Sequence, residues 1–248
     1  MVDERFMRTA LLLGDDAIGR LESSTVAVIG LGAVGGYALE ALARAGIGRL
    51  ILVDFDVFEP SNINRQILAL SSTLGQKKVE VARKRVSDIN PNCDVLIEDC
   101  FVNIENFDKI FLNIKIDFVI DAIDTIKEKC AMMAYLFEHN IPFVSAMGAA
   151  LKTDVSALKY GKLSNTAYCT MARKIRKNLK NLGVDERKID CVYSSEPNNG
   201  AQKPILKNQV GKKAVLGSLP TVTAMMGLML AHHVILSLAK TEKQHPSA

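Results

Sequence analysis

The segment TVAVIGLGAVG, residues 25–35, decides the fold of this chain. Its first part is a short run of β-branched and apolar residues, which predicts a buried strand. Its second part is a G-x-G-x-x-G loop formed by Gly30, Gly32 and Gly35, and a helical pattern over residues 34–45 overlaps its end. The glycines permit a tight turn and close approach of the backbone to phosphates, while the helix N-terminus offers free N–H groups. The segment therefore predicts a nucleotide-binding strand–loop–helix unit.

Short β-rich runs alternate with helical patterns through the first 150 residues. Most of the runs are continuously apolar, as parallel strands covered on both faces are. We expect an α/β fold with a Rossmann-like, doubly wound, mostly parallel sheet, whose ligand binds at the carboxyl ends of the strands near the switch in strand order. The expected strands are residues 25–30, 49–55, 93–99, 117–122 and 142–146, and the expected helices are residues 34–45, 77–89 and 127–139.

The pattern changes near residue 151, so we expect two parts that pack as one compact unit. Residues 1–150 form the nucleotide-binding domain with an N-terminal helical arm, and residues 151–248 form an appended basic, helical region. Within the second part, residues 167–182 read as an amphipathic helix, residues 197–213 as a loop and residues 221–239 as an apolar helix.

Composition excludes several classes of protein. Hydrophobic residues make up 48% and charged residues 23% of the 248, so the chain has material for a sizeable core and disorder is not indicated. The five cysteines form no Cys-x-x-Cys pair, which argues against a four-cysteine zinc site. The N-terminus does not read as a secretory signal, and we expect a cytoplasmic protein with reduced thiols.

The longest apolar stretch, residues 220–239, contains His232 and His233 and several hydroxyl groups. We interpret it as a buried helix rather than a membrane span, so integral membrane association is not expected. Contact with a dimer partner or with a membrane surface stays open. Adjacent residues on a helix point apart, so the two histidines are not expected to share a metal ion.

Charge is unevenly distributed along the chain, although the net charge is only +4. Residues 152–213 carry 14 Lys and Arg against 5 Asp and Glu, while the remainder is acidic. This excess suggests a polyanionic partner that docks on the second half. A solvated helix face next to a charged loop explains the charge alone equally well.

The residues after the second expected strand distinguish ATP from NAD as the expected nucleotide. That strand leads to Asp54, whose carboxylate can bind ribose hydroxyls of NAD or of ATP. Arg65 and Lys78 follow, and fixed cations there suit a site that stabilises charge on a triphosphate, whereas hydride transfer needs neither. Asp124, after the fourth expected strand, is the kind of ligand that Mg²⁺ takes. Alone, Arg65 reads as a surface ion pair and Asp124 as a helix N-cap, but together they favour an ATP site with Mg²⁺.

From about residue 5 to residue 148 the chain resembles the ThiF/MoeB/HesA superfamily, the bacterial relatives of ubiquitin-activating enzymes. The resemblance implies a homodimer in which Arg8 reaches into the partner's ATP site; without it, Arg8 reads as a solvated helix residue. It also implies that a carboxylate is activated as an acyl-adenylate, with release of pyrophosphate. The residues that match are Arg8, Gly30, Gly32, Gly35, Asp54, Asp56, Asn62, Arg65, Gln66, Lys78 and Asp124.

The same resemblance implies a role for each matching residue. Arg8, Arg65, Lys78 and Asp124 are expected to be catalytic, with Asp124 holding Mg²⁺. Phosphates are bound by Asn62, Arg65 and Lys78, the ribose by Asp54, and the glycines, Asp56 and Gln66 complete the nucleotide site.

The second half is similar to the tRNA threonylcarbamoyladenosine dehydratase (TcdA/CsdL) group. The similarity rests on DCVYSSE at residues 190–196, GSLPTVT at residues 217–223 and the apolar helix that follows. It implies a tRNA substrate of the ANN-decoding class, whose adenosine 37 carries a threonylcarbamoyl group. ATP activates the free carboxylate of that group, and an intramolecular attack closes a ring with net loss of water. Residues 151–248 then form the tRNA-binding region, and sulfur-transfer proteins are candidate partners.

The chain has no obvious thiol nucleophile, and whether any cysteine is catalytic stays open on the sequence. Some members of this group carry a cysteine shortly before the last helix, where this chain has the sequence KNQVGKK. Cys191 lies beside a Ser/Tyr/Glu cluster, but we interpret it as a small buried residue rather than a nucleophile. An intramolecular ring closure needs no nucleophile from the enzyme, because the substrate supplies proximity itself.

Three alternatives stay open on the sequence. An adenylyltransferase for the Gly-Gly end of a ubiquitin-like sulfur carrier shares the ATP site, but such members usually have two Cys-x-x-Cys pairs. An NAD-binding oxidoreductase fits the glycine loop and Asp54, yet gives no purpose to Arg65, Lys78 and Asp124. A non-catalytic binding protein fits the fold, but retention of the phosphate-site residues argues against it.

Overall fold

The computed structural model describes residues 2–197 and 216–240, and these residues build one seven-stranded sheet in the order β3-β2-β1-β4-β5-β7-β6. All neighbouring strands are parallel except β6 and β7. The strand order reverses between β1 and β4, so the predicted doubly wound α/β fold is confirmed. The strands are β1 (Thr25–Ile29), β2 (Arg49–Val53), β3 (Asp94–Glu98), β4 (Phe118–Asp121), β5 (Phe143–Ala146), β6 (Leu158–Lys162) and β7 (Asp190–Ser194).

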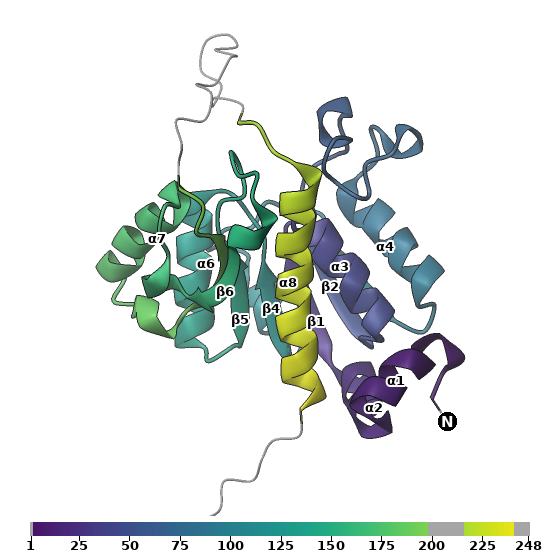
Figure 1. The fold of residues 1–248 in the computed structure, drawn as a ribbon. Helices are drawn as coiled ribbons and strands as arrows, with labels where there is room; N and C mark the ends of the chain where they lie inside the picture. The colour runs from purple at the N-terminus through teal and green to yellow at the C-terminus, as the bar shows by residue number, and fades with distance from the viewer. Residues whose placement is uncertain (1, 198–215, 241–248) are drawn as a thin grey trace, which may run out of the picture.

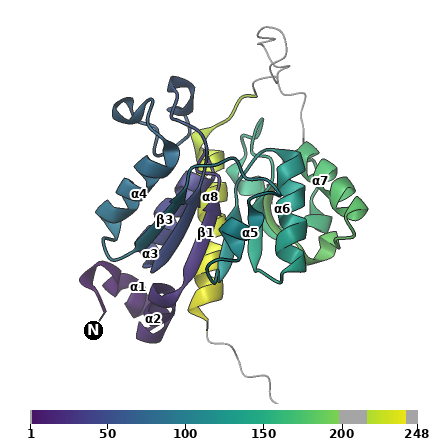
Figure 2. The ribbon, with the colours of Figure 1, turned by 180° about the vertical axis from the view of Figure 1, so that it is seen from behind.

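Helices cover both faces of this sheet (Figure 1 and Figure 2). One face carries α3 (Gly35–Ala45), α4 (Lys78–Ile89) and α8 (Pro220–Ala239), and the other carries α5 (Phe107–Phe111), α6 (Ile126–Glu138) and α7 (Thr170–Asn181). Two further helices, α1 (Met7–Leu13) and α2 (Asp15–Ser23), lie at the end where β1 begins. The buried strand β1 separates two apolar clusters, which explains its unbroken run of apolar side chains.

The expected elements of the first 150 residues appear with ends shifted by one or two residues. In the second half, β6 and β7 extend the sheet, although the sequence analysis placed no strand there. The strand β6 reads LKYGK, and lysines with a glycine are typical of an edge strand that must not pair with another chain. The strand β7 reads DCVYS and its last four residues are buried, but the sequence analysis treated this stretch as a cluster of candidate site residues and not as a strand. The expected loop at residues 197–213 lies almost entirely outside the described residues.

The apolar helix α8 packs as a core helix. It is the one described helix that is long and apolar enough to cross a membrane. Its Val222, Met226, Leu230 and Val234 side chains are buried against α3 and the sheet. The two histidines diverge, because His232 is exposed whereas His233 stacks on Tyr160 of β6 at 4.3 Å between ring centroids.

Both ends of α8 are attached to other parts of the fold. At its start, Asn64 Nδ2 donates to the carbonyl of Ser218 at 3.3 Å. At its end, Arg20 Nη2 of α2 donates to the carbonyl of Ala239 at 2.6 Å. The helix therefore runs from the carboxyl-terminal edge of the sheet to the helices at the opposite edge (Figure 1).

We predict that Gly227→Ala destabilises the protein by about 1–3 kcal/mol or more, because overpacking forces close contacts in a filled core. A Cβ atom at Gly227 would lie 2.3 Å from the carbonyl oxygen of Val34 and 2.9 Å from Cβ of Tyr37. Gly19→Ala is the matched control, since nothing lies within 4 Å of its Cβ position in α2. That change should stabilise by about 0.5–1 kcal/mol through helix propensity. Urea unfolding measures both, and equal effects would contradict close packing of α8 on α3.

Candidate nucleotide site

The glycine loop between β1 and α3 leaves room for a ligand at one glycine and not at the others. Gly30 has φ of 90°, and a Cβ atom there would lie 2.9 Å from the carbonyl oxygen of Ala122. A Cβ atom at Gly35 would lie 1.8 Å from the carbonyl oxygen of Gly30. The protein's own packing therefore requires these two glycines. A Cβ atom at Gly32 would meet only Gln66 Nε2, at 3.8 Å, so the space above Gly32 is free for close approach of a phosphate.

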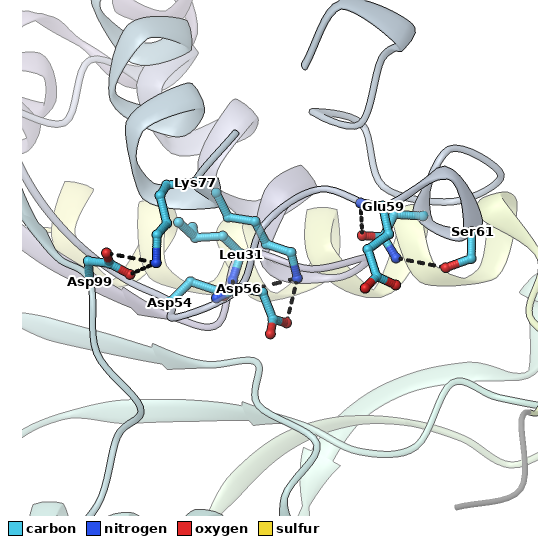
Figure 3. A network of polar contacts seen from close by, with 9 residues as sticks. Leu31, Asp54, Asp56, Glu59, Ser61, Lys77 and Asp99 are labelled. Atoms are coloured by element: carbon cyan, nitrogen blue, oxygen red, sulfur yellow. Dashed lines mark hydrogen bonds and ion pairs between the residues drawn. The ribbon is translucent and has the colours of Figure 1, made fainter. Parts of the chain in front are cut away.

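A buried carboxylate fixes this loop to the end of β2. Asp54 Oδ2 accepts the backbone N–H of Leu31 at 2.6 Å, and Asp54 Oδ1 accepts the backbone N–H of Asp56 at 2.9 Å (Figure 3). The side chain of Asp54 is 7% exposed. Hydrogen bonds from backbone N–H groups to a carboxylate are charge-assisted, so Asp54 holds the loop firmly to the end of β2.

Lys78 brings a cation to the same place. Its Nζ lies 2.9 Å from Asp56 Oδ2 and 4.0 Å from Asp54 Oδ1, and its side chain is 6% exposed. The chain reaches this position because residues 56–58 pair with residues 75–78, through contacts such as the bond from the N–H of Lys78 to the carbonyl of Asp56. Lys78 is also the first residue of α4, as expected. The neighbouring Lys77 pairs instead with Asp99 at 3.1 Å (Figure 3).

The loop after β2 presents the predicted phosphate-binding side chains. Asn62 is buried, and its Oδ1 accepts the N–H of Glu59 at 3.1 Å. Arg65 is partly exposed, and its Nη1 donates to the carbonyl of Ser61 at 2.8 Å and to Asn64 Oδ1 at 2.7 Å. The guanidinium is thus oriented by its own loop rather than by an acidic partner, which leaves its charge available to a ligand.

Two buried side-chain polar atoms of the described residues lack a hydrogen-bond partner, and one of them is Oε1 of Gln66. Its side chain is buried, its amide nitrogen faces Gly32, and its Oε1 accepts no bond. An unpartnered buried amide oxygen costs free energy, and a hydroxyl or amino group of a ligand is the kind of donor that would satisfy it. The free space at Gly32 and this amide both fit a nucleotide at the β1–β4 switch.

Asp124 lies on the turn that follows β4. Its side chain is exposed and forms no hydrogen bond or ion pair with another described residue. It is not the N-cap of α6, because that position is Thr125, which makes no side-chain cap bond. Within the described ranges no three His, Cys, Asp or Glu side chains gather as a metal cage. A single free carboxylate fits Mg²⁺, which keeps waters and phosphates as its other ligands.

An ion pair that the sequence analysis missed supports this turn. Asp121 and Lys129 are both fully buried, with 2.8 Å between Oδ1 and Nζ. Lys129 Nζ also donates to the carbonyl of Ile123 at 3.0 Å, and Ser145 Oγ donates to Asp121 Oδ2 at 2.7 Å. The sequence contains a signal for this ion pair, because Lys129 lies at helical spacing on the same buried stripe of α6 as Met133 and Leu136. A lysine on such a stripe needs a buried partner.

A second missed contact joins segments of the second half that are distant in the sequence. The buried Lys152 donates to the carbonyls of Glu196 at 2.6 Å and Tyr168 at 3.3 Å. The carboxylate of Glu196 accepts the N–H groups of Thr153 and Asp154 at 2.9 and 3.0 Å. Lys152 belongs to the basic residues counted as a surface charge, but here it is a structural residue.

Arg8 lies away from the nucleotide site of its own chain. It is exposed on α1, at the edge where the strands begin, whereas the other matching residues surround the carboxyl-terminal edge. The same helix exposes the apolar side chains of Met7, Leu11 and Leu12. A single chain therefore does not bring Arg8 to its own site.

Cys191 matches its interpretation as a buried residue. Its side chain is fully buried, and burial raises the pKa of its thiol to about 12. A thiol with this pKa is almost entirely protonated at neutral pH, whereas a nucleophilic cysteine must be a thiolate.

Comparisons with known proteins agree with this geometry. A model of the ThiF family matches residues 5–248. The chain is 37% identical to a tRNA threonylcarbamoyladenosine dehydratase from Bacillus subtilis, with 95% of each chain covered. It is 34% identical to the enzyme of that name from Escherichia coli, over 97% of this chain and 96% of the relative. The crystal structure of the Escherichia coli enzyme in complex with ATP superposes with a TM-score of 0.87, covering 98% of this chain and 97% of that one.

We predict that Lys129→Met destabilises the protein by about 3–5 kcal/mol, because it leaves the carboxylate of Asp121 buried without a counter-charge. The double variant Lys129→Met with Asp121→Asn removes both charges, so it should be more stable than the single variant. Urea unfolding of the two variants and Asp121→Asn measures the coupling. Strictly additive losses would contradict a coupled buried pair.

Proposed function

This chain belongs to the ThiF family, and we propose that it is an ATP-dependent tRNA threonylcarbamoyladenosine dehydratase. The observation that carries this proposal is the gathering of the glycine loop, Asp54 and Lys78 at the β1–β4 switch of a chain that is similar, over almost its whole length, to enzymes of that name. The substrate is a threonylcarbamoyl group on tRNA adenosine, and the product is its cyclic, dehydrated form.

The side chains divide the work on the nucleotide. Gly30, Gly32 and Gly35 let the loop approach the phosphates, while Asp54 and Asp56 fix the loop beside the ribose. Asn62 and Gln66 add polar contacts. Asp124 would hold Mg²⁺, which would supply neutralisation of charge on the triphosphate.

Arg65 and Lys78 stabilise the charge that develops as the substrate carboxylate attacks the α-phosphorus. In the structure Lys78 is paired with Asp56, so its ammonium is already desolvated and positioned when the triphosphate enters. Pre-positioned cations of this kind are effective because they need not reorganise during the reaction.

The second step uses the reactivity of the substrate. Attack of the carboxylate oxygen on ATP releases pyrophosphate and leaves an acyl-adenylate. A nitrogen or oxygen of the same modification then attacks the acyl carbon, AMP leaves, and a ring closes with net loss of water. Because both reacting groups belong to one nucleoside, the enzyme supplies orientation rather than a covalent nucleophile, which agrees with the protonated, buried Cys191.

The basic second half suits tRNA, although part of its charge is used internally. Lys152 and Arg176 hold backbone carbonyls, and Lys162 pairs with Asp190. The exposed cations left on α7 are Arg173, Lys174, Lys177 and Lys180. We assign residues 151–248 as the tRNA-binding region, in which these cations contact phosphates.

A homodimer completes the ATP site in this proposal. Arg8 is distant from the site of its own chain and lies among exposed apolar side chains of α1, which suits an interface. Arg8 of one protomer then adds a third cation to the phosphates bound by the other.

A cytoplasmic location follows from the tRNA substrate, and sulfur-transfer proteins stay candidate partners. The sulfur-carrier adenylyltransferase is the second candidate, since it requires the same ATP site.

We predict that the protein, with ATP and Mg²⁺, removes the mass of one water from the modified nucleoside of threonylcarbamoylated tRNA. Arg65→Ala should lower the rate by about 10²–10³-fold, because a preorganised charge is lost. Arg83→Ala, which removes only an exposed pair with Glu80 on α4, is the matched control and should leave the rate unchanged. Mass spectrometry of the digested tRNA measures the product. No mass change, together with pyrophosphate release on addition of a Gly-Gly-tailed carrier protein, would support the second candidate instead.

We predict that Arg8→Ala and Arg65→Ala are each inactive alone and complement each other when their protomers exchange. A mixed dimer holds one site with both arginines intact and one site with neither, so an equal mixture should recover about a quarter of the wild-type rate by the symmetry of a C2 dimer. The same assay measures the mixture after protomer exchange. Failure to recover activity in verified mixed dimers would exclude the shared site.

A further inference from the structure

Tyr168 presents an aromatic ring to solvent within the region assigned to tRNA. Its side chain is 58% exposed, and no aromatic ring of the described residues contacts it. The other exposed tyrosine, Tyr160, is 40% exposed and stacks on His233. The ring of Tyr168 is thus not used by the fold.

The backbone under this ring is held by two cations. Lys152 Nζ binds the carbonyl of Tyr168 at 3.3 Å, and Arg176 Nη1 binds the carbonyl of Thr166 at 2.9 Å. Tyr168 itself has φ of 54°, a left-handed conformation that side chains other than asparagine, aspartate and glycine rarely adopt. The turn is therefore fixed in a conformation that exposes the ring, although burial of the ring would be more favourable for folding alone.

The position of the turn relates it to the nucleotide site. The turn leads directly into α7. A Cβ atom at Gly148 would lie 3.5 Å from Sγ of Cys169 and 3.5 Å from Cβ of Met171, so the start of α7 packs on Gly148. Gly148 follows β5, which pairs with β4, and β4 leads to the turn with Asp124. Tyr168 and the site residues therefore occupy the same carboxyl-terminal edge of the sheet.

The chemistry around Tyr168 is that of a site for single-stranded nucleic acid. Exposed Arg173, Lys174 and Lys177 follow on α7 and can contact phosphates. Aromatic rings next to such cations stack on unpaired bases, and the modified adenosine lies in a single-stranded tRNA loop.

We propose that Tyr168 stacks on a base of the tRNA anticodon loop and thereby positions the threonylcarbamoyl carboxylate over the nucleotide site. The inference rests on the proposed function, which it deepens by naming a substrate-positioning residue. The ring supplies a flat surface for the base, while Lys152 and Arg176 keep that surface fixed. Since the contact is made to tRNA and not to ATP, its loss should raise the KM for tRNA and leave the KM for ATP unchanged.

Steady-state kinetics with three variants test the role of the ring. Tyr168→Asn accepts the left-handed backbone, so it should leave the melting temperature unchanged or raised while it removes the stacking surface. We expect the KM for tRNA to rise by at least about fivefold, with the KM for ATP unchanged, as for loss of a base–aromatic stack. Tyr168→Phe keeps the ring and should retain the wild-type KM for tRNA, and Tyr168→Leu should behave as Tyr168→Asn. An unchanged KM for tRNA in Tyr168→Asn, or failure of Tyr168→Phe to retain it, would overturn the proposal.

A fluorescence experiment separates stacking from attraction by charge. The chain contains no tryptophan, so Tyr168→Trp introduces a single tryptophan at the proposed contact, whose emission can be excited selectively over that of the tyrosines. We expect an RNA anticodon stem–loop to quench this fluorophore strongly, and a fully paired RNA duplex of equal length to quench it weakly. Leu182→Trp is the matched control, because Leu182 is 53% exposed at the other end of α7, next to Lys180.

The outcomes distinguish this inference from the proposed function. Quenching of Tyr168→Trp by the stem–loop alone, without quenching of Leu182→Trp, supports stacking. Equal quenching at both positions, or none at Tyr168→Trp, overturns it. Failure of the wild-type protein to dehydrate threonylcarbamoylated tRNA would overturn the proposed function, whereas an active wild type with wild-type kinetics in Tyr168→Asn would overturn only the role of Tyr168.

Discussion

The hydrogen bond from the N–H of Leu31 to the buried carboxylate of Asp54 joins the two strands on which the nucleotide site depends. The strand β1 ends in the glycine loop, and β2 leads to Asp54 and Asp56, the carboxylates that pair with Lys78. The bond is charge-assisted, and such a bond is about twice as strong as a neutral one. The other oxygen of Asp54 accepts the N–H of Asp56, whose carboxylate pairs with Lys78 at 2.9 Å. Loss of Asp54 would therefore loosen both the glycine loop and the carboxylate that positions Lys78.

Buried or half-buried cations elsewhere in the chain act on the backbone rather than on ligands. Lys129 binds the turn after β4, while Lys152 and Arg176 bind the irregular segments that follow β7 and β6. Long basic side chains suit this task because several N–H groups on one flexible stem can satisfy carbonyls from different segments. The irregular segments around the site are therefore fixed in place, which a site that orients two reacting groups requires.

The sequence predicted most of the sheet, and it singled out the candidate residues that the structure brings to the β1–β4 switch, because local signals mark both. A continuously apolar strand followed by a glycine loop marks β1, and Lys78 stands at the start of a periodic helix. Contacts between distant segments gave no such signal. Nothing near Lys152 indicates that it binds the carbonyl of Glu196, 44 residues later, and it was therefore counted as surface charge. The strand β6 was missed because an edge strand with lysines reads as polar loop.

The course of α8 has a practical consequence for attaching this protein to a surface or a label. The helix begins beside Asn64 at the carboxyl-terminal edge of the sheet and ends where Arg20 binds Ala239. Twenty residues of α-helix span about 30 Å at 1.5 Å per residue. An affinity tag or fluorophore carried by the chain after this helix is thus tethered about one domain diameter from the nucleotide site. Immobilisation through that end leaves the opposite edge open to a partner as large as a folded RNA.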